Sequence, residues 1–245
     1  MILELSILGI FVGVLSGFFG IGGGTVSVPI LLYLGFDIKE AIGISVMQMV
    51  AGSLVAGFIH KKKQTYDTSN IIFFGYGGIV GAIIGGFLVK ILDSSVLGWL
   101  FLSLVVFTLI RLITTTPKPS RNEFVNRPVY SGIGAFIGVF SGMLGVGGSI
   151  LMTPILVSFM GFELKKATAI GLFFVMFTSI SALATLLYLD LVDIKSALIM
   201  SVASVGGIAI GIGLLNRVKL THYKQILVLF YIVIFIITAK KIVLG

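Results

Sequence analysis

Eight stretches of this chain contain no aspartate, glutamate, lysine or arginine, and their lengths limit what the chain can fold into. They are residues 5–36, 41–60, 68–89, 94–110, 128–162, 167–189, 196–216 and 225–239. A helix that crosses a bilayer needs about 20 apolar residues. Six stretches therefore have roughly the length of one crossing, although the last is short. The stretches 5–36 and 128–162 are too long for one helix and short for two.

The composition indicates a membrane protein and excludes other classes. Apolar residues make up 58% of the 245 residues and charged residues only 11%, whereas about 25% are charged in soluble domains. The chain has no cysteine and only two histidines, so disulfides and a multi-histidine metal site are not expected. We attribute the net charge of +8 to the positive-inside rule and not to nucleic-acid binding. The sequence predicts an all-α, polytopic helical membrane protein without a cofactor.

Each of the two long stretches contains a glycine-rich segment and a later proline. The first segment reads GFFGIGGG at residues 17–24 and the second GMLGVGGS at residues 142–149, and Pro29 and Pro154 follow them. Glycine permits a left-handed backbone, and proline lacks the N–H that a helix needs. We therefore expect each stretch to form two short helices that meet at an unwound glycine turn, with Pro29 and Pro154 as helix-breaking residues.

The chain contains an internal repeat. When it is shifted by 125 residues, Gly9–Leu31 aligns with Gly134–Leu156, and 12 of the 23 positions are identical. One inserted residue then changes the offset to 126, which pairs Ser53 with Ser179. We expect a first transmembrane repeat at 1–113, a polar cytoplasmic linker at 114–127 and a second repeat at 128–245. Each repeat would hold a glycine-broken helical hairpin and three spanning helices.

Charge counting separates two possible orientations of the repeats. If each glycine-broken stretch folds back to its starting side, 12 Lys and Arg residues lie inside and 5 outside. If each broken stretch crosses the membrane once, the chain has eight spans and the split is 10 to 7. Basic residues collect on the cytoplasmic side, so the first arrangement fits better. It makes the two repeats inverted, and parallel repeats are the alternative.

The two glycine turns are candidates for an anion-binding site. An unwound turn leaves N–H groups without helical partners, and the helix that follows adds the positive end of its dipole. Inverted-repeat transporters bring such breaks together near the bilayer midplane. No charged residue lies deep in any stretch, so backbone and neutral side chains would hold the anion. The candidate substrate-binding residues are Gly20, Gly22, Gly23, Gly24, Thr25, Ser27, Gln48, Gly145, Gly147, Gly148, Ser149 and Thr153.

Some polar and glycine residues also have a structural explanation. Gln48 is either a ligand of the anion or one side of a hydrogen bond between two helices. Glycines in membrane helices often serve only for close packing. Close packing is our interpretation for Gly75, Gly77, Gly78, Gly81, Gly85, Gly86, Gly206, Gly207, Gly211 and Gly213.

The doubled motif is similar to that of a known family. The pattern GxxSGxxGxGG followed by PxL occupies residues 13–31 and again residues 138–156, beside KEAIGIS at 39–45 and KKATAIG at 165–171. Together these segments resemble the sulfite exporter TauE/SafE family, also called the 4-toluene sulfonate uptake permease family. The resemblance covers nearly the whole chain. One departure is Ser149, where the first half has Gly24, and another is the segment Ala169-Ile170-Gly171, which aligns with Gly43-Ile44-Ser45.

The resemblance implies a prokaryotic plasma-membrane permease for sulfite, sulfonates, thiosulfate or related sulfur-containing anions. The residues themselves predict an anion transporter that works by alternating access, and only the resemblance supplies sulfur. The expected partners are a small anion and the lipid bilayer, a homodimer is left open, and nucleic acid is not expected. An enzyme is not expected, because no histidine or acidic residue lies deep in a span. The alternatives are an anion channel, a scaffold subunit and a permease for non-sulfur organic anions.

Overall fold

The computed structural model describes residues 2–19, 22–61, 72–114, 126–162, 164–215 and 220–244. These segments form ten α-helices and no strand, so the predicted all-α fold is confirmed. The first half contains α1 (Ile2–Phe19), α2 (Gly24–Tyr33), α3 (Ile38–Lys61), α4 (Ile72–Ile91) and α5 (Ser94–Thr114). The second half contains α6 (Arg127–Leu144), α7 (Ser149–Phe159), α8 (Leu164–Tyr188), α9 (Ile194–Leu215) and α10 (Leu220–Leu244).

Seven of these helices are long and apolar enough to cross a membrane, namely α1, α3, α4, α5, α8, α9 and α10. Large apolar side chains such as Ile91, Tyr188 and Val202 are exposed on their outer faces. In a bilayer such side chains face lipid, which is as apolar as the protein interior. The chain is therefore a multi-pass membrane protein.

Each glycine-broken stretch consists of one long helix and one short helix. α1 and α6 have 18 residues each, whereas α2 has 10 and α7 has 11. At 1.5 Å per residue, the long helix is about 27 Å and the short one about 15 Å. We expected two short helices in each stretch, and this expectation is wrong for the first helix of each, α1 and α6. Gly13 and Gly17 stay helical because they are packed against the backbone of α9 at Ser204 and Ile208.

The two prolines lie inside the short helices, so the prediction that Pro29 and Pro154 break the helix is wrong. The breaks come earlier, at the glycines, and each proline occupies the sixth position of its helix. There it removes a single N–H, the one that would bond to the carbonyl group four residues before it. In α2 that carbonyl belongs to Thr25, and in α7 it belongs to Ile150.

Two helix pairs form the tightest contacts, and each pair joins the two halves. α1 packs on α9, and α4 packs on α6. A Cβ atom added to the small residues at these interfaces would collide with the partner's backbone, as small-xxx-small packing requires. The glycines concerned are Gly9, Gly13, Gly17, Gly207 and Gly211 in the first pair and Gly77, Gly81, Gly85, Gly134, Gly138 and Gly142 in the second.

The close-packing interpretation of the other glycines is confirmed for eight of ten. Gly75, Gly78 and Gly86 abut side chains of α8, and the five at the helix-pair interfaces abut backbone. Gly206 and Gly213 are the exceptions, because a Cβ atom at either position would have nothing within 4 Å. Both lie on the exposed face of α9, so close packing is wrong for them.

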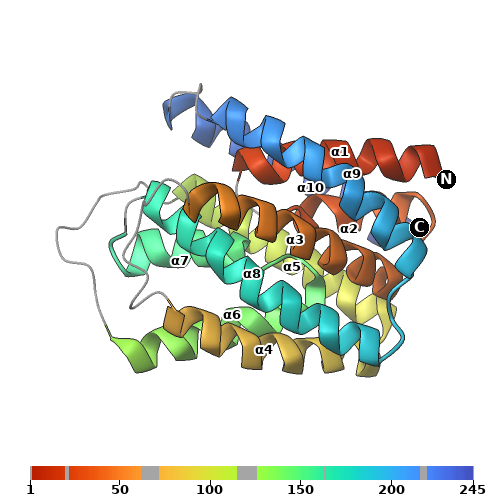
Figure 1. The fold of residues 1–245 in the computed structure, drawn as a ribbon, viewed down its shortest axis with the longest axis horizontal. Coiled ribbons are helices and arrows are strands. Elements are labelled where there is room, and N and C mark those ends of the chain that lie inside the picture. Colours follow the sequence, from red (N-terminus) through yellow and green to blue (C-terminus); the bar gives the residue numbers. More distant parts are fainter. Residues whose placement is uncertain are drawn as a thin grey trace.

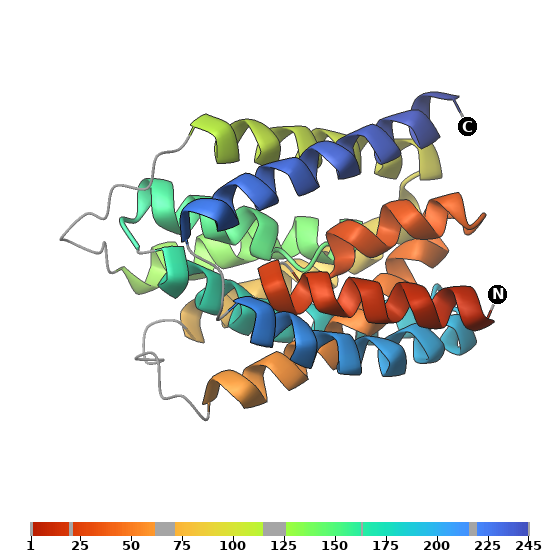
Figure 2. The same ribbon diagram turned by 90° about the horizontal axis from the view of Figure 1, so that it is seen from above.

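Helix contacts repeat when the two halves are exchanged. The contact of α1 with α9 corresponds to that of α6 with α4, and the contact of α2 with α3 corresponds to that of α7 with α8. In Figures 1 and 2, α1 starts at the end of the molecule where α10 finishes, and α6 starts at the opposite end. Corresponding helices α1 and α6 therefore run in opposite directions in these views, which favours inverted over parallel halves.

Candidate functional site

Both glycine turns use backbone conformations that other residues rarely adopt. The φ angles are 79° at Gly22 and 74° at Gly23 in the first turn, and 64° at Gly145, 75° at Gly147 and 71° at Gly148 in the second. A side chain at positive φ is strained by contacts between its Cβ atom and the backbone. The glycines therefore allow the chain to reverse between a long and a short helix. Of the predicted site residues, Gly20 lies outside the described residues.

The two turns lie against one another in the interior. Gly24 is so close to the Gly145 carbonyl that a Cβ atom on Gly24 would overlap its oxygen. Gly23 and Gly148 are the N-caps of α2 and α7, and neither helix has a side-chain cap. The convergence of the two turns, which the repeat predicted, is therefore present within the described residues. It places the positive ends of two short helices in the core.

The backbone hydrogen bonds at the start of α2 and α7 leave some N–H groups of the first helical turn unpaired among the described residues. The N–H groups of Val26 and Ser27 both donate to the Gly23 carbonyl at 3.0 Å. In the second half, Leu151 and Met152 donate to the Gly148 carbonyl at 3.1 and 2.9 Å.

The N–H groups of Thr25, Ser149 and Ile150 find no acceptor within the described segments. Unpaired N–H groups at a helix N-terminus can bind an anion.

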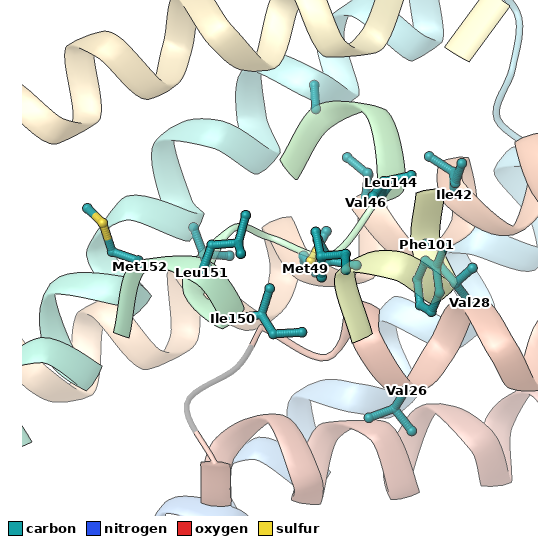
Figure 3. Close-up of a cluster of buried hydrophobic side chains, with 14 of the residues drawn as sticks. Val26, Val28, Ile42, Val46, Met49, Phe101, Leu144, Ile150, Leu151 and Met152 are labelled. Atoms are coloured by element: carbon teal, nitrogen blue, oxygen red, sulfur yellow. The ribbon is translucent and has the colours of Figure 1, made fainter. Parts of the chain in front are cut away.

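Two apolar side chains occupy the space between the turns. A Cβ atom on Gly22 would lie 3.3 Å from Val175 and 3.6 Å from the sulfur of Met49, and one on Gly147 would lie 2.8 Å from that sulfur. Both side chains are buried. Figure 3 shows Met49 among buried apolar side chains of α2, α3 and α7. Neither residue was among the predicted site residues, although the offset of 126 pairs Met49 with Val175.

Three predicted polar residues of the site are buried without a hydrogen-bond partner. Thr25 and Gln48 are 0% exposed and Ser149 is 1% exposed. The Thr25 Oγ1, both amide atoms of Gln48 and the Ser149 Oγ have no partner among the described residues. Ser201 Oγ is the one further such atom in that part of the chain. Burying an unpaired polar group costs about 1–3 kcal/mol, so this concentration of unpaired groups beside the glycine turns makes the region a candidate site for a polar ligand.

Gln48 lies directly against the first glycine turn. A Cβ atom on Gly23 would be 2.5 Å from Gln48 Oε1 and 3.1 Å from Nε2. In the second half Phe174 takes the corresponding place, where a Cβ atom on Gly148 would be 2.6 Å from the phenyl ring. The alternative explanation of Gln48 was a hydrogen bond between two helices. Neither end of its amide has a hydrogen-bond partner among the described residues.

Ser27 and Thr153 are placed differently from the three unpaired residues. Ser27 Oγ donates to Ser45 Oγ at 2.8 Å, and Ser45 Oγ donates to the Gly145 carbonyl oxygen at 2.8 Å. The Ser27 hydroxyl hydrogen is therefore already used. Thr153 is partly exposed on α7, and its Oγ1 would lie 3.6 Å from a Cβ atom on Gly171. Ser45 was not among the predicted site residues, although it is the last residue of the segment KEAIGIS.

Comparisons with known proteins agree with this architecture. The family model described as sulfite exporter TauE/SafE matches residues 5–238. A probable membrane transporter protein of Methanocaldococcus jannaschii is 30% identical over 242 residues, which cover 91% of this chain and 90% of that protein. A probable membrane transporter protein of Haemophilus influenzae is 25% identical, with 90% and 87% covered. No solved structure matches the chain. The chain therefore belongs to the sulfite exporter TauE/SafE family of membrane transporters.

Proposed function

We propose that this protein is a permease of a prokaryotic plasma membrane that moves small anions, namely sulfite or a related sulfur-containing anion such as a sulfonate or thiosulfate. One observation carries the proposal. The N-termini of two short helices meet in the core, and the buried polar atoms of Thr25, Gln48 and Ser149 beside them are unpaired. The family supplies the sulfur chemistry, and the site supplies the preference for an anion.

The charge of the site comes from the backbone. Each helix N-terminus carries roughly half a positive elementary charge, and the described residues around both turns are neutral. N–H groups and hydroxyls donate hydrogen bonds to oxyanions. A metal cation would need carboxylate or carbonyl oxygens arranged around it, and among the described residues no carboxylate lies beside the turns. The arrangement therefore favours an anion over a cation.

The pairing of the helices supports a proposal of alternating access. The pairs α1–α9 and α4–α6 are each held by backbone-to-backbone contact, so each is expected to move as one rigid unit. Met49 and Val175 fill the space between the glycine turns. We propose that rocking of one pair against the other moves these apolar side chains apart and exposes the site to each side in turn. A channel would need a continuous polar path, which apolar contacts at this point do not favour.

Anion uptake into proteoliposomes tests the proposal. Purified protein would be reconstituted and supplied with sulfite, thiosulfate, a sulfonate, sulfate or acetate, with protein-free vesicles as the blank. We expect saturable uptake of at least one sulfur-containing anion. Absence of uptake of every anion by folded protein would contradict the proposal, uptake of acetate alone would favour a non-sulfur permease, and unsaturable flux at channel rates would favour a channel.

The matched controls come from the glycines. Gly147→Val introduces a branched side chain at φ 75° against Met49 and is expected to abolish uptake. Gly132→Ala changes an exposed helical glycine that has nothing within 4 Å of the added Cβ atom and is expected to transport normally. If the two variants behave alike in folded protein, the glycine turns do not form the site.

A further inference from the structure

Gln48 makes the two halves of the candidate site chemically different. The repeat offset of 126 pairs Gln48 with Phe174, and each side chain lies against the glycine that caps the short helix of its own half. Gln48 is completely buried, and both ends of its amide are unpaired among the described residues. The first half thus presents a polar group to the α2 N-terminus where the second half presents a phenyl ring to the α7 N-terminus.

A carboxamide has a chemical requirement that a hydroxyl does not share. Its NH₂ group only donates hydrogen bonds and its oxygen only accepts them, whereas a hydroxyl does both. A fully deprotonated oxyanion offers acceptors alone, so it would leave Gln48 Oε1 unpaired and would repel it. Rotating the amide exchanges the two ends but does not remove this requirement. A ligand that pairs both ends must carry a donor of its own.

The charge of the surroundings limits the charge of the ligand. The described residues around the two turns include no Lys, Arg or His, and the two helix ends together supply roughly one positive elementary charge. Desolvating a second negative charge in such a site is costly. A singly charged anion therefore fits this site better than a dianion.

On the basis of the proposed anion transport, we propose that the transported species is a singly charged oxyanion that keeps one O–H group, and that Gln48 selects it. Gln48 Oε1 accepts the hydrogen bond from this O–H, and Nε2 donates to another oxygen of the anion. The hydroxyls of Thr25 and Ser149 are further donors at the N-termini of the two short helices. Among sulfur-containing anions, bisulfite has this form and a sulfonate does not. Each anion carries its proton with it across the membrane.

Two probes of equal charge and similar shape test this proposal. Methanesulfonate has three acceptor oxygens and no O–H, whereas hydrogen methylphosphonate, the singly charged anion of methylphosphonic acid, has the same outline and charge with one O–H. Binding of each would be measured by calorimetry on purified, full-length protein at a pH where the phosphonate keeps one proton. An unpaired buried polar group costs enough to weaken binding roughly 5- to 150-fold. We expect wild-type protein to bind the phosphonate more tightly than the sulfonate by a factor in that range.

A matched pair of substitutions locates the origin of the preference. Gln48→Met keeps the length of the side chain and removes both hydrogen-bonding groups, so we expect the preference to fall to about one. Phe174→Met makes a change at the corresponding position of the other half and is expected to keep the preference. Size-exclusion profiles and thermal unfolding would establish that both variants are folded.

The outcomes separate this inference from the proposed function. Equal binding of the two probes by wild-type protein would overturn the role of the O–H, whether or not Gln48→Met folds, and would leave anion transport intact. A folded Gln48→Met protein that still prefers the phosphonate would overturn the role of Gln48. If wild-type protein binds neither probe nor bisulfite and transports no anion in proteoliposomes, the proposed function fails and this inference fails with it.

Discussion

The hydroxyl of Ser45 donates a hydrogen bond of 2.8 Å to the carbonyl oxygen of Gly145, which links α3 of the first half to the glycine turn of the second. Ser27 on α2 donates to the same hydroxyl at 2.8 Å. The second half has no equivalent of these two hydrogen bonds, because the repeat places Gly171 opposite Ser45 and Met152 opposite Ser27. These two hydrogen bonds therefore tie the glycine turn of the second half to side chains of the first half.

Removing the Ser45 hydroxyl is expected to loosen this link. Ser45→Ala leaves the Gly145 carbonyl and the Ser27 hydroxyl without this partner, and hydrogen bonds between membrane helices contribute about 0.5–2 kcal/mol each. We expect a lower free energy of unfolding by that amount, measured by denaturant or thermal unfolding in detergent. Ser103→Ala is the control, because Ser103 is exposed and its hydroxyl bonds to the Trp99 carbonyl of its own helix. An equal effect of both substitutions would contradict the link.

The glycine turns should tolerate side chains much less well than the exposed glycines do. Gly22→Val and Gly147→Val each place a branched residue at positive φ, against Val175 and Met49 respectively, so transport should be lost while most of the protein still inserts. Gly206→Ala is the control, since nothing lies within 4 Å of its added Cβ atom. Transport would be measured in proteoliposomes, and normal transport by folded Gly22→Val would refute a site formed by the turns.

Several features of the fold were predictable because they depend on local chemistry. Charge-free stretches located the helices, and the paired glycine segments located both turns, since only glycine adopts positive φ there without strain. The position of the prolines was not predictable in this way. Pro29 lies in α2 because Gly22 and Gly23 already reverse the chain before it.

The polar candidates of the site were only partly separable from sequence. A buried hydroxyl without a partner and one inside a relay look the same in a sequence, so Thr25 and Ser27 could not be distinguished. Met49 and Val175 read as ordinary apolar residues, and their place between the turns depends on packing across the two halves. The pairing of α1 with α9 likewise depends on long-range contact, which a periodic pattern within one helix does not encode.

The orientation of the halves is expected to be inverted, with both ends of the chain on one side and the linker on the other. Because the chain has no cysteine, single cysteines can be labelled from one side of the membrane. Tyr188 lies at the end of α8 and its side chain is 82% exposed, and Asn126 lies just before α6. The two variants are Tyr188→Cys and Asn126→Cys. We expect an impermeant thiol reagent on intact cells to label the first and not the second. Labelling of the second alone would mean a reversed orientation. If neither cysteine is labelled on intact cells and both are labelled once the membrane is permeabilised, the halves are parallel.

Single basic residues should matter little for substrate binding. The basic residues of the described segments lie near helix ends, at Lys39, Lys90, Arg111, Arg127, Lys195, Lys240 and Lys241, and at positions 61, 165, 166 and 224. Replacing each by Gln should change the dissociation constant less than about threefold by calorimetry, with or without sodium, because helix ends and neutral donors hold the anion. A single basic residue whose loss abolishes binding in folded protein would contradict this account.

The unpaired hydroxyls predict opposite effects on stability and binding. Ser149→Ala and Thr25→Val each remove a buried polar atom that has no partner among the described residues, so the free energy of unfolding should stay level or rise by about 1 kcal/mol. If the same hydroxyls bind the anion, losing a hydrogen bond to a charged ligand costs about 1.5–3 kcal/mol, which is a loss of roughly 10- to 150-fold in affinity. Stabilising substitutions that damage function are typical of binding sites.

Unfolding in detergent and calorimetry on the same preparations would measure both effects. Thr108→Val is the control, because the Thr108 hydroxyl is buried but bonds to Leu104 of its own helix. A lower stability of Ser149→Ala with unchanged affinity would show that this hydroxyl serves the fold and not the substrate.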